Sequence, residues 1–333
     1  MKQSVLFAAL AVAVPSALRA QAAVDLTVSS SIGQVMGYSS VEVTGIASRF
    51  TNETGRLVLQ LDPGKTYRIR VKHLGYRAAD TTITISADQR YSLKVTLNPI
   101  VVEVAATRVS GKTNCRMASD EESALGRIVG ELRKNAEREA LLRSSYPFVY
   151  KLVRDYEAPE GFRLKPRRDT VEYPSDIEDR YEPGNIVRYA RNPVPGAARE
   201  LRIPTLVDLA DESFLKVHCF YYRGVTLVDG ARLHKIDFEP VPGFNKADVR
   251  GSAYLDETTF VIRRAVFTID RPQKLVPPVV GLEVTTTYRE ILPGLALVDF
   301  IRGVQDMPGR SREQRIEEQR LIAVHFTDRM PGQ

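Results

Sequence analysis

The sequence contains few of the residues that usually build catalytic or metal-binding centres. Its 333 residues include four histidines, two cysteines and no tryptophan. No histidine is followed by glutamate three residues later, so the His-x-x-Glu pair of a zinc peptidase is missing. The Gly-x-Ser-x-Gly, His-Glu-x-x-His, P-loop and dinucleotide-binding motifs are missing as well. We therefore predict no catalytic residues, no metal site and no cofactor, and we predict that the protein is not an enzyme.

The histidines do not pair with acidic residues in a useful way. His234 with Asp237 and His325 with Asp328 come closest, but residues three apart on a strand point to opposite faces. We expect structural roles for all four histidines: His73, His218, His234 and His325. Several carboxylates fall at predicted turns and strand ends, and their pairing stays open: Asp237, Glu239, Asp248 and Asp256.

Long apolar runs are missing, except at the N-terminus. Val5–Val14 is an apolar run of ten residues after Lys2, and Ala20-Gln21-Ala22 has the small-x-small pattern that a signal peptidase needs. Residues 1–22 therefore form a predicted signal peptide, with cleavage after Ala20 as the alternative. The run is too short to span a bilayer, and no later run reaches about 18 residues. We expect export across the inner membrane to the periplasm or outer-membrane surface, and peripheral membrane association stays open.

A strong charge of one sign is also missing. The formal net charge is +6, and removal of Lys2 and Arg19 with the signal peptide leaves +4. No block of like charge stands out, so the arginines are expected on solvated strand faces and in ion pairs. Nucleic-acid binding is not expected.

The two cysteines are Cys115 and Cys219. In an oxidising compartment such a pair favours a disulfide. Closing a loop of about 100 residues stabilises a protein by roughly 4–5 kcal/mol in the chain-entropy model. The alternative is two separate buried thiols. A reactive pair of Cys219 with His218 is less favoured, because neighbours on a strand point apart.

Residues 23–98 predict a small β-sandwich. Short runs such as Arg56–Leu61 and Tyr67–Val71 alternate apolar with polar residues and are separated by turn residues. In the turn at Asp62, proline presets the backbone and glycine accepts a positive φ. About seven such strands are enough for an immunoglobulin- or transthyretin-like sandwich with its own core.

Three turns of this segment share a pattern in which small or rigid residues precede a strand. They are Thr51–Leu57 with Gly55, Leu61–Tyr67 with Pro63 and Gly64, and the pair Gly75–Tyr76. The pattern resembles the carboxypeptidase regulatory-like domain, a transthyretin-like β-sandwich found on bacterial envelope proteins. The resemblance implies an attachment or binding module, and it is weakest over Ser29–Ser40, where the opening strand is expected.

Residues 99–144 predict a linker followed by an amphipathic helix. Ser119 and Glu122 form a capping box that places the start of the helix at Ser119. Apolar residues then recur at spacings of three and four: Leu125, Ile128, Val129, Leu132, Ala136 and Ala140. Charged residues mostly occupy other faces: Glu121, Glu122, Arg133 and Arg138. The helix is expected to cover a sheet with one face, and a docking role for a partner is the alternative.

Residues 145–333 predict an antiparallel β domain, so that the whole chain is mainly β with an α+β second half. The expected strands are Pro147–Tyr150, Phe214–Phe220, Leu233–Phe238, Thr259–Phe267, Leu282–Tyr288, Leu295–Ile301 and Arg315–Phe326. Hairpin turns at Asp229-Gly230 and Pro293-Gly294 indicate one large curved sheet covered by the helix. Residues 155–200 are expected to be long loops.

Short segments of this half resemble an uncharacterised C-terminal domain of bacterial envelope proteins, and also the half-barrels of periplasmic lipoprotein carriers. They are His218–Phe220, Ile236–Pro240 and Gly251–Asp256, with a glycine-led strand that turns at Asp256. Aromatic residues either form plain core or line a groove for lipid or peptide: Phe214, Phe220, Tyr221, Tyr222, Phe238, Tyr254 and Phe260.

Together these patterns predict a non-catalytic binding or scaffolding protein of the bacterial envelope. Its partner would be an envelope protein, a peptide or a lipid. One alternative is a lipid or lipoprotein carrier that uses the concave face of the C-terminal sheet. A hydrolase whose residues cannot be recognised from spacing is the other alternative.

Overall fold

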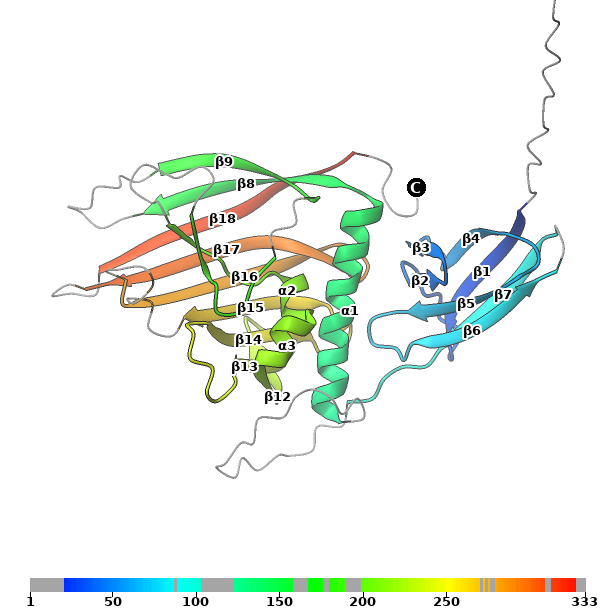
Figure 1. Ribbon diagram of the computed structural model, residues 1–333, viewed down its shortest axis with the longest axis horizontal. Helices are drawn as coiled ribbons and strands as arrows, with labels where there is room; N and C mark the ends of the chain where they lie inside the picture. The colour runs from blue at the N-terminus through cyan, green and yellow to red at the C-terminus, as the bar shows by residue number, and fades with distance from the viewer. Residues whose placement is uncertain are drawn as a thin grey trace, which may run out of the picture.

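The structure is a computed structural model. It describes residues 21–86, 89–102, 123–157, 167–176, 180–189, 199–269, 272, 275, 279–308 and 313–327. Within these residues the protein is mainly β, as predicted, with a small N-terminal sandwich and a large C-terminal sheet on either side of a long helix (Figure 1). None of the described helices has the length and apolar character needed to cross a membrane.

The N-terminal sandwich is built from a three-stranded and a four-stranded sheet. The first sheet has the order β4-β1-β7, with β1 (Ala22–Ser30), β4 (Arg56–Leu61) and β7 (Tyr91–Leu97). The second has the order β3-β2-β5-β6, with β2 (Ser40–Val43), β3 (Ile46–Phe50), β5 (Lys65–Lys72) and β6 (Ala79–Ile85). Alternate residues such as Leu26 of β1 and Ile69 of β5 are fully buried and share one core. The period-two pattern therefore packs the two sheets face to face.

The turns of the sandwich need glycine where the sequence has it. Gly55 has a φ of 71°, and a Cβ there would lie 2.7 Å from the carbonyl oxygen of Val28. Gly64 follows Pro63 in the β4–β5 turn with a φ of 77°. A side chain at either position would be strained, and at Gly55 it would also clash.

The C-terminal sheet has nine strands in the order β12-β13-β14-β15-β16-β17-β18-β8-β9, all paired antiparallel. The strands are β8 (Phe148–Glu157), β9 (Arg167–Pro174), β12 (His218–Val228), β13 (Ala231–Pro240), β14 (Val249–Asp256), β15 (Ile262–Ile269), β16 (Gly281–Leu292), β17 (Leu295–Met307) and β18 (Glu313–Phe326). A separate ribbon pairs β10 (Val187–Tyr189) with β11 (Arg199–Leu201). Three helices are described: α1 (Ala124–Ser145), α2 (Leu206–Ala210) and α3 (Glu212–Val217).

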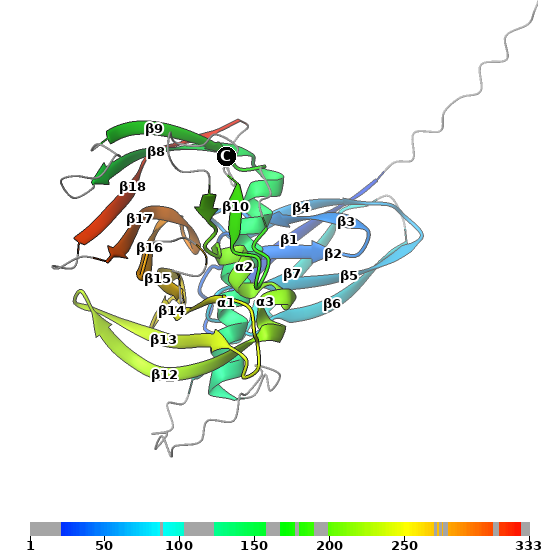
Figure 2. The same ribbon diagram turned by 60° about the vertical axis from the view of Figure 1, so that its left-hand side comes forward.

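The large sheet curls so that its concave side holds the helices (Figure 2). Apolar residues of α1, including Ile128 and Leu132, pack in one core with Phe238 and Phe267 of the sheet. The sandwich has a separate core, and a third small cluster joins the two units through Phe50. The two halves therefore have separate main cores that meet along one side of α1.

The helix differs from its prediction in two respects. It begins at Ala124 rather than at Ser119, because Ser123 is extended and its side chain accepts a hydrogen bond from the amide of Gly126. The predicted cap residues, Ser119 and Glu122, lie outside the described residues. Ala140 is exposed and Arg138 is buried, so the expected one-sided burial is wrong in detail. The physical reason is that α1 is covered by the sheet on one side and by the sandwich on another.

Two strand predictions are also corrected. Phe214–Val217 is helical, since Asp211 caps α3 by accepting the amide of Ser213, and the strand begins only at His218. The region expected to be loop contains β9, whose alternating residues add a ninth strand beside β8. Short polar-apolar alternation in a segment rich in arginine and proline hides this strand from a sequence reading.

The predicted disulfide joins residues of which only one is described. Cys219 is fully buried at the start of β12, and Cys115 lies outside the described residues. We expect a non-reducing proteolytic digest to yield one linked peptide pair that contains both cysteines, because a protein exported as the sequence predicts would fold in an oxidising compartment. Alkylation of both thiols in unreduced, denatured protein would contradict the bridge. The alternative of two separate buried thiols would then hold.

Candidate functional site

The histidine beside Cys219 is enclosed rather than reactive. His218 is fully buried, and its ring stacks on Phe214 with 3.8 Å between the ring centroids. Its ring nitrogens lie 3.0 Å from the carbonyl oxygen of Phe214 and 3.2 Å from that of Val249. Burial lowers the pKa of His218, although Asp248 opposes the shift. A fully enclosed imidazole cannot serve a substrate from solvent.

Asp248 is held by hydrogen bonds that join two segments. Its oxygens accept the hydroxyl proton of Tyr181, the amide of Gly184 at 2.9 Å and the amide of Val249 at 2.8 Å. Burial raises the pKa of Tyr181 far above its usual range, so the phenol stays a donor. The cluster fastens residues 180–187 to β14, as satisfied buried polar groups commonly do.

The other candidate carboxylates support turns and the outer sheet surface. Asp237 accepts from Arg223 Nε at 2.7 Å, and Glu239 accepts from the hydroxyl of Tyr221 at 3.1 Å. Asp256 accepts the amides of the two threonines that follow it in the β14–β15 turn. Across the described ranges, no three His, Cys, Asp or Glu side chains are close enough together to hold a metal ion.

The apolar half of the concave face is filled by the protein itself. Phe220, Phe238, Phe267 and Val284 form one row across β12–β16 and are all buried under the helices. His234 lies beside them, hydrogen-bonded to the hydroxyl of Tyr222 at 2.7 Å. Most of the predicted aromatic set is therefore core, and Tyr221 and Tyr254 are only partly buried.

The other half of the concave face, on β17, β18, β8 and β9, carries charged and polar side chains beside apolar ones such as Leu152 and Leu321. Ile301 packs against the helix-covered core and pairs with Gln319, which pairs with Arg154. Side chains paired in register point to the same face of a sheet. Arg154 and Asp169, its partner on β9, therefore lie on the concave side. We call this surface the polar concave face.

A bidentate ion pair lies across the two outermost strands of the polar concave face, β8 and β9. Arg154 donates from Nε to Asp169 Oδ1 at 3.0 Å and from Nη2 to Oδ2 at 2.8 Å. The hydrogen bonds from Arg154 lower the pKa of Asp169, so its carboxylate stays charged. One row further, Tyr156 pairs with Glu317, whose carboxylate accepts from Gln319 Nε2 at 2.8 Å.

Aromatic rings border this ion pair on the same face. Tyr150 and Tyr173 are paired in register and stacked, with ring centroids 5.4 Å apart. Both rings and Tyr156 are only partly buried. The surface thus combines half-exposed aromatic rings with fixed charges, the composition that favours protein partners at interfaces.

The seam between the sandwich and α1 contains a second polar cluster. Glu131 of α1 accepts the amide of Gly75 at 2.8 Å and the ammonium of Lys134 at 2.6 Å. Lys134 also donates to the carbonyl oxygen of Tyr76. Burial raises the pKa of Glu131, and Lys134 opposes this shift. The predicted Gly75–Tyr76 turn is therefore one part of the sandwich that docks on α1.

Arg138 lies further along the seam, and no acidic side chain among the described residues is within ion-pair distance of it. Its Nε donates to the carbonyl oxygen of Gly294 at 2.7 Å, and its guanidinium lies 5.4 Å from the centre of the Phe50 ring. The residue is 2 % exposed, and burial lowers its pKa to about 10. The preceding buried residue, Asn135, bridges the carbonyl oxygen of Phe260 and the amide of Ile262.

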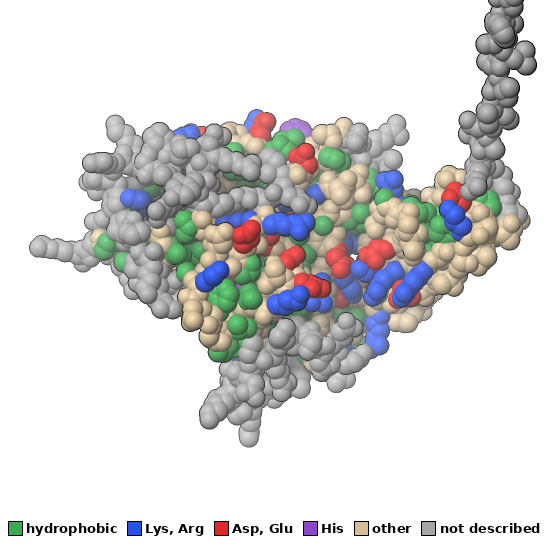
Figure 3. Space-filling view, in the orientation of Figure 1, with side chains coloured by type: hydrophobic (Ala, Val, Ile, Leu, Met, Phe, Trp, Pro, Cys, Tyr) green, Lys and Arg blue, Asp and Glu red, His purple; other side chains and the backbone are tan. Residues whose placement is uncertain are grey.

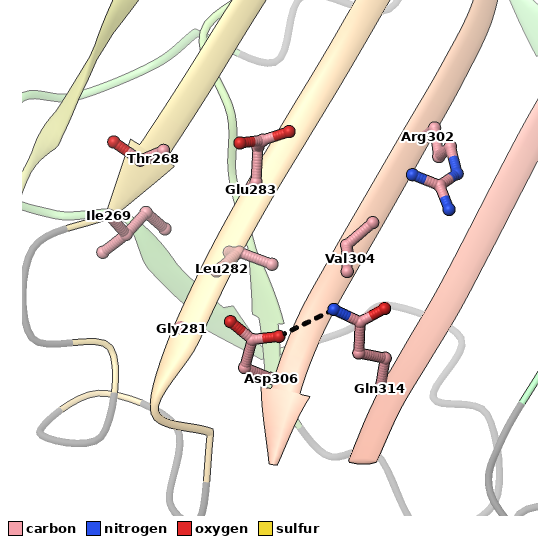
Figure 4. Close-up of a pocket in the computed structure, with 9 residues that line it drawn as sticks. All are labelled: Thr268, Ile269, Gly281, Leu282, Glu283, Arg302, Val304, Asp306 and Gln314. Carbon is pink, nitrogen blue, oxygen red and sulfur yellow. Dashed lines mark hydrogen bonds between the residues drawn. The ribbon is translucent and has the colours of Figure 1, made fainter. Parts of the chain in front are cut away.

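Two open clefts are described, one on the large sheet and one at the seam between the two units. One of about 410 Å³ lies at the ends of β15–β17, where Asp306 accepts from Gln314 at 3.1 Å beside Glu283 (Figure 4). The other, of about 400 Å³, lies at the seam between residues 34–38, His73 and Pro293. On the face shown in Figure 3, acidic and basic side chains are interspersed over the described surface. No arrangement among these residues suggests a catalytic centre.

The remaining turn positions of the sequence analysis have clear geometric roles. Gly75 has a φ of 78°, and a Cβ there would lie 3.2 Å from the ring of Phe260. At Gly251 a Cβ would lie 1.9 Å from the carbonyl oxygen of Val266, so β14 and β15 approach too closely for any side chain. These glycines position elements and do not contact a site.

Sequence reasoning missed the residues of both polar clusters. Asp169 lies in the region predicted to be loop, so no sequence pattern indicated that it pairs with Arg154. Glu131 and Asn135 fall on the helix between the apolar positions, and their burial depends on the docked sandwich. The one usable signal was a polar residue flanked by apolar positions at helical spacing.

Comparison with known proteins supports a family for one segment only. Residues 52–100 match the model of the PEGA domain, which covers β4 to β7. The family supported for this segment is therefore PEGA, and the carboxypeptidase regulatory-like assignment remains a resemblance. No curated protein matches the chain significantly.

Solved structures show weak likeness. A DUF1329 family protein from Desulfovibrio piger is 13% identical, with a TM-score of 0.32, over 60% of this chain and 93% of that one. A Vibrio parahaemolyticus domain named for outer-membrane lipoprotein sorting is 11% identical, with a TM-score of 0.33, over 59% and 93%. The Pseudomonas aeruginosa MucA/MucB complex is 9% identical, with a TM-score of 0.22, over 61% of this chain and 100% of that one. TM-scores of this size do not establish a shared fold.

The seam should depend on Glu131 far more than on its exposed neighbour. Glu131→Ala leaves the ammonium of Lys134 and the amide of Gly75 without their buried partner, and we expect a loss of roughly 3 kcal/mol in unfolding free energy. Glu137→Ala, the control, removes a half-exposed ion pair with Lys72 and should cost less than about 1 kcal/mol. Urea denaturation measures both, and equal losses would contradict this account of the seam.

Proposed function

We propose that the protein is an exported, non-catalytic binding protein of the bacterial cell envelope that holds a polypeptide partner on its polar concave face. The observation that carries this proposal is the bidentate pair of Arg154 and Asp169 among half-exposed tyrosines. Such a surface offers both hydrogen-bonding partners and flat apolar area to a polypeptide. The sandwich would act as the attachment module that the PEGA match and the turn pattern both suit.

The same observation argues against an acyl-chain carrier. A lipid tail laid on the polar concave face would cover Arg154 and Asp169 with hydrocarbon and remove both charges from water. Burial of charged groups costs several kcal/mol per ion in practice, and hydrocarbon offers no hydrogen bonds in return. The apolar half of the concave face is already occupied by α1 and its core.

Export rests on the predicted signal peptide, and the burial of Ala22 favours the earlier of the two cleavage positions. Ala22 is the first residue of β1, is fully buried and pairs with Leu61. Cleavage after Ala20 would keep this strand whole, whereas cleavage after Ala22 would remove one buried residue. We therefore expect the mature protein to begin at Gln21, and intact-mass measurement of periplasmic protein tests this. A mass that begins at Ala23 would contradict it.

A photo-crosslinking experiment tests the binding face. We expect p-benzoylphenylalanine in place of Tyr173 to form adducts with a polypeptide in cells, because that ring lies on the polar concave face. The matched control replaces Thr170 on the same strand, which is exposed on the opposite face and should give no adduct. Adding Arg154→Ala to the Tyr173 variant should weaken its adduct several-fold.

Mass spectrometry of an organic extract of the purified protein separates the proposal from its main alternative. Stoichiometric phospholipid without a polypeptide adduct at position 173 would overturn the proposal and establish a carrier. Equal adducts at positions 170 and 173 would also overturn it, since binding would then not be specific to the concave face.

A further inference from the structure

The seam between the sandwich and α1 contains a histidine, an ionisable group, close to the turn by which the two units dock. His73 lies in the β5–β6 loop, next to the Gly75 turn that docks on α1, and lines the seam cleft. Its Nδ1 is 3.1 Å from the hydroxyl of Ser39, whose own proton goes to the carbonyl oxygen of Met36 at 2.9 Å. Nδ1 therefore donates to Ser39, and Nε2 has no protein partner in the part of the chain that the structure describes. This arrangement suits a neutral imidazole.

The charges that face His73 across the seam are mostly positive. From α1, Lys134 Nζ is 3.4 Å from the carbonyl oxygen of His73, and Arg138 lies close enough to act on its charge. Glu131, also on α1, is already engaged by Lys134 and the amide of Gly75.

The groups that the other elements around His73 contribute offset little of this positive charge. They are Ser39, the ring of Tyr76 at 5.6 Å, Glu53 at the same cleft, and Lys72, which is shared between Glu42 and Glu137. A positive charge at position 73 would therefore face two cations held in place by the helix, Lys134 and Arg138.

We propose that the seam is a proton-sensitive latch, in which protonation of His73 in mildly acidic surroundings weakens the docking of the sandwich on α1. The sandwich would keep its own separate core when the latch opens. Opening would uncover Phe50 and Leu74, which are now buried against the C-terminal unit. The latch would thus convert a fall in pH into a newly exposed apolar surface.

The sign of the effect follows from the linkage of proton binding to docking. Burial, Arg138 and Lys134 together lower the pKa of His73 to about 3 in the docked state. The undocked loop should have the ordinary pKa near 6.5, so below that value the undocked state binds the proton and docking is penalised. Between pH 7.5 and 5.5 the docking equilibrium constant should fall about tenfold.

One other group at the seam also responds to pH. Burial raises the pKa of Glu131 in the docked state, so its proton uptake would favour docking as the pH falls and would oppose the effect of His73. A variant without the imidazole therefore isolates the part of the change that comes from His73.

Hydrogen exchange of the Gly75 amide tests the latch in the full-length protein, because this amide is protected by Glu131 across the seam. After correction for intrinsic exchange, its protection factor should fall about tenfold between pH 7.5 and 5.5. The amide of Val71, inside the β2–β5 ladder, should change less than about twofold. In the His73→Gln variant the fall at Gly75 should disappear, whereas His325→Gln, at an exposed position, should retain it.

A fall of the same size in His73→Gln, or constant protection in the unchanged protein, would overturn the proposal. If the glutamine variant does not fold, the imidazole of His73 can be titrated directly by NMR. The latch requires this ring to stay neutral at pH 5.5 while Gly75 remains protected. An ordinary pKa near 6.5 without loss of protection at Gly75 would sink it.

Discussion

The architecture depends on one helix being buried on two sides. One side of α1 contributes Ile128, Val129 and Leu132 to the core of the large sheet. Another side holds Glu131 and Arg138, whose partners come from the Gly75 turn and from the β16–β17 hairpin. The apolar side supplies most of the stabilisation, as burial of large side chains generally does. The polar side sets the orientation of the sandwich, because hydrogen bonds and ion pairs tolerate only a narrow geometry.

Strands of the sandwich such as β4 and β5 were predictable because each has one buried face, which leaves a period of two in the sequence. The opening strand was not, since β1 runs over Ala22–Ser30 rather than Ser29–Ser40. The hairpins at Asp229-Gly230 and Pro293-Gly294 were predictable from turn residues that take positive φ. The burial of Arg138 was not, since it depends on a unit distant in sequence. Nor was the helical state of Phe214–Val217, because a short apolar run is ambiguous and a single cap at Asp211 decides it. Structure set by residues close together in sequence could be predicted, and contacts between segments distant in sequence could not.

The concave face changes character from one edge of the sheet to the other. Over β12–β16 it is apolar and closed by the protein's own helices, while over β17, β18, β8 and β9 it carries tyrosines and paired charges. The register that puts Ile301, Gln319, Arg154 and Asp169 in one row makes this change gradual. A single curved sheet thus provides both a core and an interaction surface.

The strand order of the sandwich constrains how the chain can be assembled. β1 lies in the middle of its sheet, between β4 and β7, and its pairing with β7 is parallel. The first strand to be synthesised therefore keeps an open edge until the last strand of the unit, which ends at Leu97, has left the ribosome. Such an edge can pair with other chains in the meantime. A holding chaperone or rapid handover to a translocation machinery would shorten this vulnerable interval.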